Sequence, residues 1–288
     1  MELLHLVAPS LRGAKRRGNP YKMLIRVGTE MISIHIEPIK AFTDNYIWAI
    51  VNDDNKTVWM VDPGDAEPVI AYLQAKKLRL CGILITHHHH DHCGGVQVLR
   101  ERYVIPVYGP KHSDILATAV VEEGQQVFLP ECHLFFEVFA IPGHTLEHVA
   151  YYCASDKILF CGDTLFSAGC GRVFEGTAEQ MTASLMKLAA LPDDTLIYCA
   201  HEYTLKNLQF AKTVEPNNSD IDLRLDCVKG LAGKPSVPTP LALEKKINPF
   251  LRAHVPAVIA AAENRAQKSL EDPVNVFSFI REWKNNFV

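Results

Sequence analysis

Short apolar runs recur along residues 31–202 and predict β-strands. Ile32 to Ile36 alternates apolar and polar side chains, and later runs are rich in β-branched and aromatic residues. Between them lie segments whose apolar side chains recur at helical spacing, so we predict a mixed α/β domain. The predicted strands are Ile32–Ile36, Tyr46–Val51, Thr57–Val61, Gly82–Thr86, Val104–Tyr108, Leu134–Ile141, Val149–Cys153, Lys157–Phe160 and Thr195–Cys199. The predicted helices are Glu67–Lys77, Gly95–Arg102 and Ala178–Ala190.

Residues 203–288 show a different pattern, without comparable strand runs. They are rich in helix formers, are interrupted by a proline-rich stretch at 235–240, and end in apolar residues at helical spacing. These last residues are Phe277, Ile280, Trp283 and Phe287. We therefore predict two domains, 31–202 and a smaller helical one at 203–288.

Residues 1–30 do not match the rest of the chain, because they carry six basic side chains and two acidic ones. The apolar stretch precedes the charges, which is the wrong order for a secretory signal peptide. We interpret residues 1–30 as an N-terminal extension, expected to be disordered, with Met31 as the natural start. The alternative is a mitochondrial transit peptide.

Composition excludes several classes of protein. The chain has 288 residues, 29 basic and 33 acidic side chains and 48% hydrophobic residues, which predicts a folded chain with a sizeable core. No apolar run approaches the roughly 18–20 residues that span a bilayer. The net charge of -4 gives no reason to expect nucleic acid or a membrane as partner.

Charge is divided unevenly between the two predicted domains. Residues 31–202 hold 11 basic and 22 acidic side chains, whereas residues 203–288 hold 12 and 9. An acidic domain suits a cation, and a mildly basic neighbour suits an anionic small molecule, although charged runs usually mean only a solvated face.

The eight cysteines form no Cys-x-x-Cys pair, which excludes zinc-finger and thioredoxin motifs. Cys153, Cys161 and Cys199 lie in apolar segments and are expected to be core residues in a reducing compartment. We therefore expect a cytoplasmic protein, or a mitochondrial one if residues 1–30 are a transit peptide.

Histidine is the unusual residue type: the chain has thirteen, and five of them fall between His87 and His92. This segment follows an apolar strand and precedes Gly94 and Gly95. In an extended turn alternate side chains face the same way, so His87 and His89 can meet one ion while Asp91 and His92 face another. The competing interpretation is a solvated polar loop.

Three more candidate ligands stand in turns beside predicted strands: His144, Asp163 and His201. Singly, each is equally well explained as a capping or loop residue. Together with the His-x-His-x-Asp-His segment they predict a metal site, and imidazole with carboxylate suits zinc, iron or manganese.

The combined motifs resemble the metallo-β-lactamase superfamily, and within it the glyoxalase II (hydroxyacylglutathione hydrolase) family. The resemblance covers residues 31–288. It implies an αββα sandwich followed by a smaller all-helical domain that binds glutathione. The motifs are His87-x-His89-x-Asp91-His92, Thr43-Asp-Asn-Tyr46, Val61-Asp-Pro-Gly64, Gly162-Asp-Thr-Leu-Phe166, Gly169-Cys-Gly-Arg172, Phe174-Glu-Gly-Thr177 and His201-Glu-Tyr-Thr204.

The resemblance also implies two divalent metal ions, with zinc expected first and iron or manganese as alternatives. His87, His89 and His144 would bind one ion, and Asp91, His92 and His201 the other. Asp163 would bridge both, together with a hydroxide. The implied reaction is hydrolysis of S-D-lactoylglutathione and related 2-hydroxyacyl-glutathione thioesters to D-lactate and glutathione, the second step of methylglyoxal detoxification.

Such a site suits a thioester. Zinc lowers the pKa of a bound water to about 7, and a thiol with a pKa of about 8.5 leaves without strong acid assistance. A nucleophilic side chain is unnecessary, so Ser167 and Cys170 are predicted to be structural.

The resemblance places five residues at the glutathione pocket: Arg172, Phe174, Tyr203, Arg281 and Lys284. Arg281 and Lys284 are three positions apart and thus share a helical face. They match a basic pair that binds the glycine carboxylate.

Three positions depart from the family pattern. Glu147 and Ala200 stand where glycine is usual, and Asn285 where aspartate follows the basic pair. If position 147 needs a positive φ, Glu147 strains the turn that holds His144.

Several related activities are less compatible with the sequence. A persulfide dioxygenase uses one iron and lacks the second ligand set, and a β-lactamase would not carry this helical domain. A nuclease should present a basic surface. Another thioesterase or hydrolase of the superfamily and a non-catalytic metal-binding protein stay open. We expect a monomer, with a small glutathione thioester as its partner.

Overall fold

The computed structural model describes residues 22–27 and 30–287. Two mixed β-sheets face each other at its centre. The first contains β1 (Lys22–Val27), β2 (Glu30–Ala41), β3 (Asn45–Asn52), β4 (Thr57–Val61), β5 (Arg79–Leu84), β6 (Val107–Gly109) and β7 (Ala119–Val120) in sequence order. The second has the order β15 (Thr239–Pro240), β14 (Leu196–Cys199), β11 (Ile158–Gly162), β10 (Val149–Cys153), β9 (Leu134–Ala140) and β8 (Gln126–Leu129). A two-stranded ribbon consists of β12 (Leu165–Phe166) and β13 (Gly169–Cys170).

The apolar core lies in two layers around the first sheet. One face of this sheet packs on helices α1 (Ala66–Lys76) and α3 (Val96–Arg102), with Val69 and Leu99 among the buried contacts. The other face contributes Trp48 and Ile50 to a core shared with the second sheet. Both faces are buried, which explains why β3 and β4 are almost continuously apolar rather than alternating.

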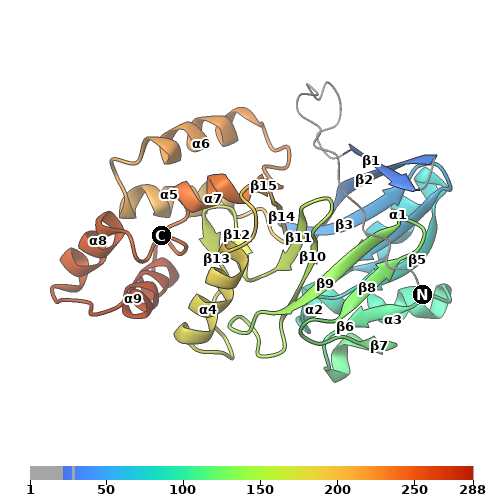
Figure 1. Cartoon of the computed structure of the whole chain (residues 1–288), viewed down its shortest axis with the longest axis horizontal. Helices are drawn as coiled ribbons and strands as arrows, with labels where there is room; N and C mark the ends of the chain where they lie inside the picture. Colours follow the sequence, from blue (N-terminus) through green and yellow to red (C-terminus); the bar gives the residue numbers. More distant parts are fainter. Residues whose placement is uncertain (1–21, 28–29, 288) are drawn as a thin grey trace, which may run out of the picture.

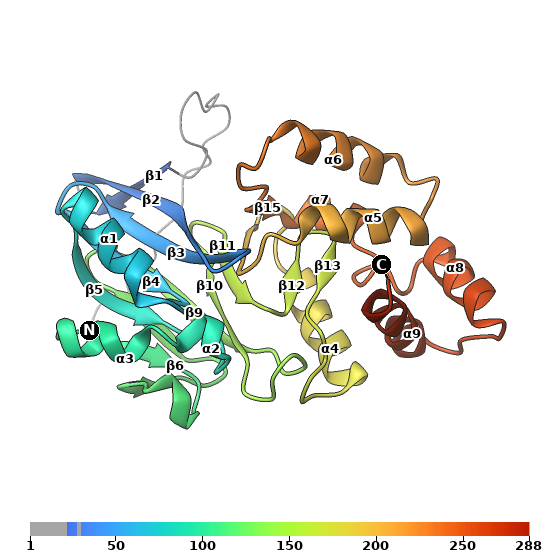
Figure 2. The ribbon, with the colours of Figure 1, turned by 180° about the vertical axis from the view of Figure 1, so that it is seen from behind.

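Helix α4 (Ala178–Ala189) completes the sandwich beside the second sheet, as Figures 1 and 2 show. Its start is encoded locally, because Thr177 and Gln180 form a reciprocal capping box. Its apolar residues Met181, Leu185 and Leu188 all join the core shared by the sheets. The expected αββα arrangement is therefore confirmed.

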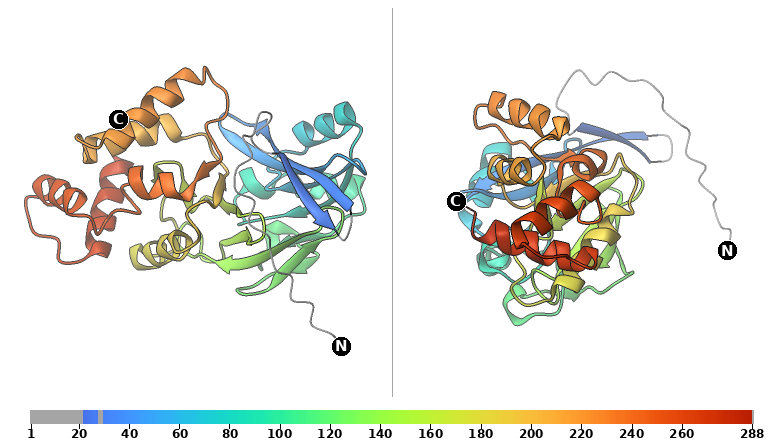
Figure 3. Two further views of the ribbon diagram at one scale, coloured as in Figure 1. Left: turned by 45° about the horizontal axis from the view of Figure 1, so that its top comes forward. Right: turned by 90° about the vertical axis from the view of Figure 1, so that its left-hand side faces the viewer.

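The remaining long helices gather at one end of the sandwich, and in the right-hand view of Figure 3 they lie in front of the sheets. Helix α9 packs against α4 and α8, and α5 packs on β13. Phe210, Phe250 and Phe277 extend the sandwich core into these helices. The helices are α5 (Thr204–Val214), α6 (Ser219–Gly230), α7 (Leu241–Ile247), α8 (Pro256–Ala266) and α9 (Pro273–Asn285).

Most predicted elements are present with unchanged bounds or with shifts of one to three residues at their ends, while β2 continues five residues beyond the predicted end at Ile36. The run Val104–Tyr108 is the clearest error, because β6 begins only at Val107 and the side chain of Val104 is fully exposed. Pro106 has no N–H for a strand ladder, although its carbonyl accepts a hydrogen bond from Ile83. The short strands β7, β8, β12, β13 and β15 were not predicted.

Two segments differ from the prediction because of pairing between distant residues. The expectation that residues 1–30 are disordered is wrong for Lys22–Val27, which pairs antiparallel with β2. Residues 1–21 lie outside the described part of the chain. The segment predicted as wholly helical also contributes β15, which pairs with β14.

Candidate metal centre

The candidate ligands follow the ends of four strands, where the two sheets approach each other. His87 follows β5 of the first sheet, while His144, Asp163 and His201 follow β9, β11 and β14 of the second. Asn45 at the start of β3 forms a β-bridge with His201, which ties the two sheets together at this edge. Candidate ligands from four strand ends, well separated in the sequence, are thereby brought together.

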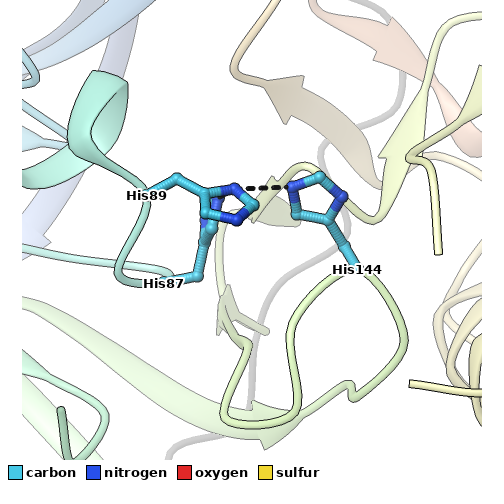
Figure 4. Close-up of side chains that lie close together, drawn as sticks. All are labelled: His87, His89 and His144. Carbon is cyan, nitrogen blue, oxygen red and sulfur yellow. Dashed lines mark hydrogen bonds between the residues drawn. The ribbon is translucent and has the colours of Figure 1, made fainter. Parts of the chain in front are cut away.

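His87, His89 and His144 form the first group, and their rings converge from two facing loops (Figure 4). The Nδ1 atom of His89 lies 3.1 Å from Nε2 of His87 and 3.0 Å from Nε2 of His144. Ligands of one tetrahedral zinc lie about 3.3 Å apart, given Zn–N bonds of about 2.0–2.1 Å. This spacing fits one metal ion.

Asp91, His92 and His201 form the second group. Oδ2 of Asp91 lies 3.6 Å from Nε2 of His92 and 3.5 Å from Nε2 of His201. The segment does not stay extended, because the one-turn helix α2 (His90–Cys93) begins directly after His89. Asp91 and His92 both lie in that turn, which brings their ligand atoms toward His201, while the ring of His92 also contacts that of His87, with 4.0 Å between centroids.

Asp163 lies between the two groups. Its Oδ2 is 3.4 Å from Nε2 of His144, while its Oδ1 is 3.4 Å from Nε2 of His92 and 3.3 Å from Nε2 of His201. Each carboxylate oxygen therefore faces one group, which is the geometry of a bridging ligand.

Two buried atoms at this position have no hydrogen-bond partner, Nε2 of His92 and Oδ1 of Asp163. Buried polar atoms are normally satisfied, so an unpartnered pair that faces a cluster of candidate ligands needs a physical explanation. A cation between the two groups satisfies both atoms. The residues present thus fit divalent metal ions, as the sequence predicted.

The second ring nitrogens of four histidines are held by oxygen atoms. Nδ1 of His87 meets Oγ1 of Thr86 at 3.0 Å, and Nδ1 of His144 meets the Arg172 carbonyl at 2.8 Å. Nδ1 of His92 meets Asp62 at 3.0 Å, and Nδ1 of His201 meets Asp44 at 2.8 Å. If Nδ1 carries the proton, each Nε2 presents its lone pair to the centre, as metal ligands require.

Sequence reasoning did not assign roles to these supporting residues. Asp62 accepts hydrogen bonds from the N–H and hydroxyl of Thr86 as well as facing His92. Asn45 donates to Oδ2 of Asp91 at 3.0 Å. The signal was available, because these residues lie in the Thr43–Tyr46 and Val61–Gly64 motifs, which were used only to establish a resemblance.

Fully buried His148 is a further residue that the sequence did not single out. Its Nδ1 donates to the Val149 carbonyl at 3.1 Å, and its Nε2 accepts the N–H of Asp163 at 3.2 Å. Its ring also stacks on His87 at 4.5 Å between centroids. His148 therefore positions the backbone of the bridging residue.

Electrostatics divides the centre into two halves. Burial lowers the pKa of His87 well below its usual value and also lowers the pKa of His144, so these imidazoles stay neutral. Burial alone raises the pKa of a carboxyl group, but His201 and His92 outweigh it and hold the pKa of Asp163 well below its ordinary range. Burial alone would lower the pKa of His92 and His201, but Asp163 outweighs it and raises both, so the charged carboxylate lies between a neutral pair of imidazoles and a pair that is coupled to it.

A cavity of about 440 Å³ leads from the centre to the C-terminal helices. Among the described residues its lining contains one acid, Asp163, and four cations: Arg172, Lys206, Arg281 and Lys284. Burial, together with Arg281 and Lys206, lowers the pKa of Lys284 to about 8. The cavity therefore suits an anionic ligand at neutral pH.

The remaining predicted pocket residues also line this cavity. The ring of Tyr203 stacks on His201 with 4.7 Å between centroids, and the exposed ring of Phe174 lies 5.2 Å from that of His144. Arg281 is buried, and it donates to the Cys170 carbonyl at 2.7 Å. The structure thus brings together all five residues predicted for the glutathione pocket.

Glu147 does not strain its turn, because its φ is not positive; in that loop Gly143 has the positive φ, at 152°. The condition under which Glu147 would strain the turn is therefore not met. The side chain instead contacts His88, with Oε1 2.6 Å from Nδ1 of that ring.

Comparison with known proteins places the site in a defined class. Residues 42–201 match the family model described as the metallo-beta-lactamase superfamily, and residues 202–287 match the model described as the hydroxyacylglutathione hydrolase C-terminus. The solved structure of ETHE1 from Myxococcus xanthus is similar, with a TM-score of 0.58 and 26% identity over 87% of this chain and 97% of that chain. The fold and the His/Asp groups are those of a metallo-β-lactamase-type protein that binds divalent metal ions.

Two relatives define the family within this class. A hydroxyacylglutathione hydrolase of Nitrosomonas eutropha is 49% identical over 258 residues, 88% of this chain and 99% of that protein. One from Vibrio parahaemolyticus is 50% identical over 261 residues, 88% of this chain and all of that protein. This chain belongs to the hydroxyacylglutathione hydrolase family, the thioester hydrolases also called glyoxalase II.

Proposed function

We propose that the chain hydrolyses S-D-lactoylglutathione and related 2-hydroxyacyl-glutathione thioesters to the 2-hydroxy acid and glutathione, the second step of methylglyoxal detoxification. The observation that carries the proposal is that the seven candidate ligands and the cationic cavity form one continuous site. Asp163 and Lys284 both line this cavity, so a thioester that binds in it can contact both residues.

We further propose zinc as the first choice of metal. His87, His89 and His144 would hold one ion, Asp91, His92 and His201 the other, and Asp163 both. Metal ions bound there supply hydroxide at neutral pH and polarise the thioester carbonyl. Iron and manganese accept the same ligands.

The residues around the metal ligands act by holding and orienting those ligands. Asp62, Asp44, Thr86 and the Arg172 carbonyl fix the histidine rings, so that Nε2 faces the centre. Half-buried Tyr203 has a raised pKa, so it stays protonated and can donate a hydrogen bond near His201. The leaving thiolate needs no acid from the protein.

The same proposal assigns the far end of the cavity to glutathione. Lys284 offers a charge to the glycine carboxylate, and Arg281 shapes the wall through its bond to the Cys170 carbonyl. Arg172 and Phe174 line the metal-proximal side, where Phe174 contacts His144. Cys170 is buried, and burial raises its pKa, so it is a poor nucleophile.

We place the catalytic domain at residues 31–202 and the glutathione-binding domain at 203–288, in a monomeric cytoplasmic enzyme. None of the helices in the described part of the chain is long and apolar enough to cross a membrane. Seven cysteines are buried as free thiols, among them Cys153, Cys161 and Cys199.

The test is loss of the thioester from S-D-lactoylglutathione by metal-loaded protein, with and without a chelator. We expect turnover that the chelator abolishes and zinc restores. A persulfide dioxygenase would instead consume oxygen with glutathione persulfide; the second group of ligands, Asp91, His92 and His201, argues against that reaction. Failure of the metal-loaded chain to cleave the thioester would refute the proposal.

A further inference from the structure

His88 lies between two ligands of the first group and is held by two acidic side chains. Oε1 of Glu147 lies 2.6 Å from Nδ1 of His88 and accepts the backbone N–H of His88 at 3.1 Å. On the other side of the ring, Oε1 of Glu175 lies 3.4 Å from Nε2. His88 is thus fixed through its backbone and both ring nitrogens.

Glu175 extends these contacts to the facing loop. Its Oε2 accepts the backbone N–H of Leu146 at 2.9 Å, next to Glu147. The segment that carries Glu175 also supplies the Arg172 carbonyl to Nδ1 of His144 and the N–H of Phe174 to the His144 carbonyl. The contacts therefore join the His87–His89 segment, the His144 loop and residues 172–175.

These three segments carry or support the whole first group of ligands. None of the contacts just described involves Asp91, His92 or His201, which are held by Asn45, Asp62 and Asp44 instead. The contacts of Glu147, His88 and Glu175 thus lie on the side of the first group, whereas Asp62 contacts His92 and, through Thr86, also His87. All three side chains are at most about a third exposed, at 17% for His88, 18% for Glu147 and 35% for Glu175, so their hydrogen bonds are partly shielded from water.

We propose that Glu147, His88 and Glu175 form a brace that positions His87, His89 and His144, and so sets the affinity of the first metal ion independently of the second. The inference rests on the proposed metal assignment. The three are positioning residues, because they act through the ligands. Removing an outer partner of a metal ligand typically weakens metal binding about 10- to 100-fold.

The test measures zinc binding to the metal-free full chain in competition with a chromophoric chelator. Glu147→Ala should weaken one of the two dissociation constants about 10- to 100-fold and leave the other within about twofold. Asn45→Ala is the matched control, because it removes the hydrogen bond to Asp91. Asn45→Ala should weaken binding of the second ion and leave binding of the first unchanged.

Cobalt identifies the affected site. In an NMR spectrum with one equivalent of Co²⁺, each imidazole that binds the ion gives one paramagnetically shifted N–H signal. Glu147→Ala should show two such signals, from His92 and His201. Asn45→Ala should show three, from His87, His89 and His144. Glu147→Gln keeps one accepting oxygen for the His88 N–H, so its affinity for the first ion should fall between wild type and Glu147→Ala.

The proposal is overturned if Glu147→Ala weakens the binding of both ions equally or of neither. It is also overturned if Asn45→Ala and Glu147→Ala weaken the binding of the same ion. Glu147→Gln gives the same measurement if the alanine variant does not fold. If the wild-type protein binds two ions but the Glu147 variants do not weaken binding of the first ion selectively, the brace is overturned and the proposed function is not affected. Wild-type protein that binds fewer than two overturns the proposed function as well.

Discussion

Asp163 is the single residue on which both halves of the metal centre depend. One carboxylate oxygen faces His144 and the other faces His92 and His201. Asp163→Ala should lower kcat at least about a thousandfold, equivalent to about 4 kcal/mol in the barrier. Thioester hydrolysis and metal content measured on the same sample check this, and a thermal melt shows that the variant is folded. Near-normal turnover would refute the two-metal arrangement.

Lys284 gives a prediction about pH. Burial, Arg281 and Lys206 lower its pKa to about 8 in the free protein. Below that pH the ammonium group attracts the substrate carboxylate, and above it the charge is lost. We therefore expect KM to rise as the pH increases through about 8, with kcat much less affected.

Lys284→Met is the control for this effect. It should show a higher KM than wild type at pH 7 and no rise attributable to position 284 above pH 8. Steady-state kinetics between about pH 6.5 and 9.5 provide the comparison. An identical pH dependence of KM in both proteins would remove Lys284 from the binding site.

At the scale of elements, the centre depends on close backbone approaches at strand ends. Gly171 follows β13, and a Cβ atom there would lie 1.9 Å from the Asp163 carbonyl oxygen. Gly171→Ala should therefore displace Asp163, destabilise the fold by about 1–3 kcal/mol and lower kcat/KM at least about tenfold. Denaturation and kinetics measure the two effects.

Gly230 offers a matched control, because it ends helix α6 and a Cβ atom there meets nothing within 4 Å. Gly230→Ala should be neutral, or stabilise by up to about 1 kcal/mol, through the higher helix propensity of alanine. Equal losses of activity in the two variants would show that Gly171 has no special role.

At the scale of the whole molecule, metal binding and stability are linked. The ligands come from both sheets, so unfolding separates them and releases the ions. One ion at a hundred times its Kd stabilises the fold by about 2.7 kcal/mol. For a chain of this size that corresponds to about 4–5 °C in Tm.

Calorimetry of the metal-free protein at increasing zinc concentrations tests this linkage. Tm should rise with the logarithm of free zinc, and the Asp163→Ala variant should show a smaller rise. A Tm independent of zinc would mean that the ions do not bind the folded centre.

The sequence alone determined the alternation of strands and helices, the chemistry of the ligands and the motifs that place His87 to His92 in one loop. These properties are local, because hydrophobic period, capping residues and motif spacing act over a few neighbouring positions. The strand ends at His144, Asp163 and His201 were recognisable for the same reason.

Only the tertiary structure decided what depends on contacts between distant residues. Lys22–Val27 becomes a strand because β2 pairs with it, and β6 starts late because Pro106 cannot donate to a ladder. Glu147 changed from a suspected source of strain into a partner of His88, 59 positions away. Asp62 and Asp44 likewise acquire roles through His92 and His201, since a hydrogen bond depends on the position of both partners in space and not on their order in the chain.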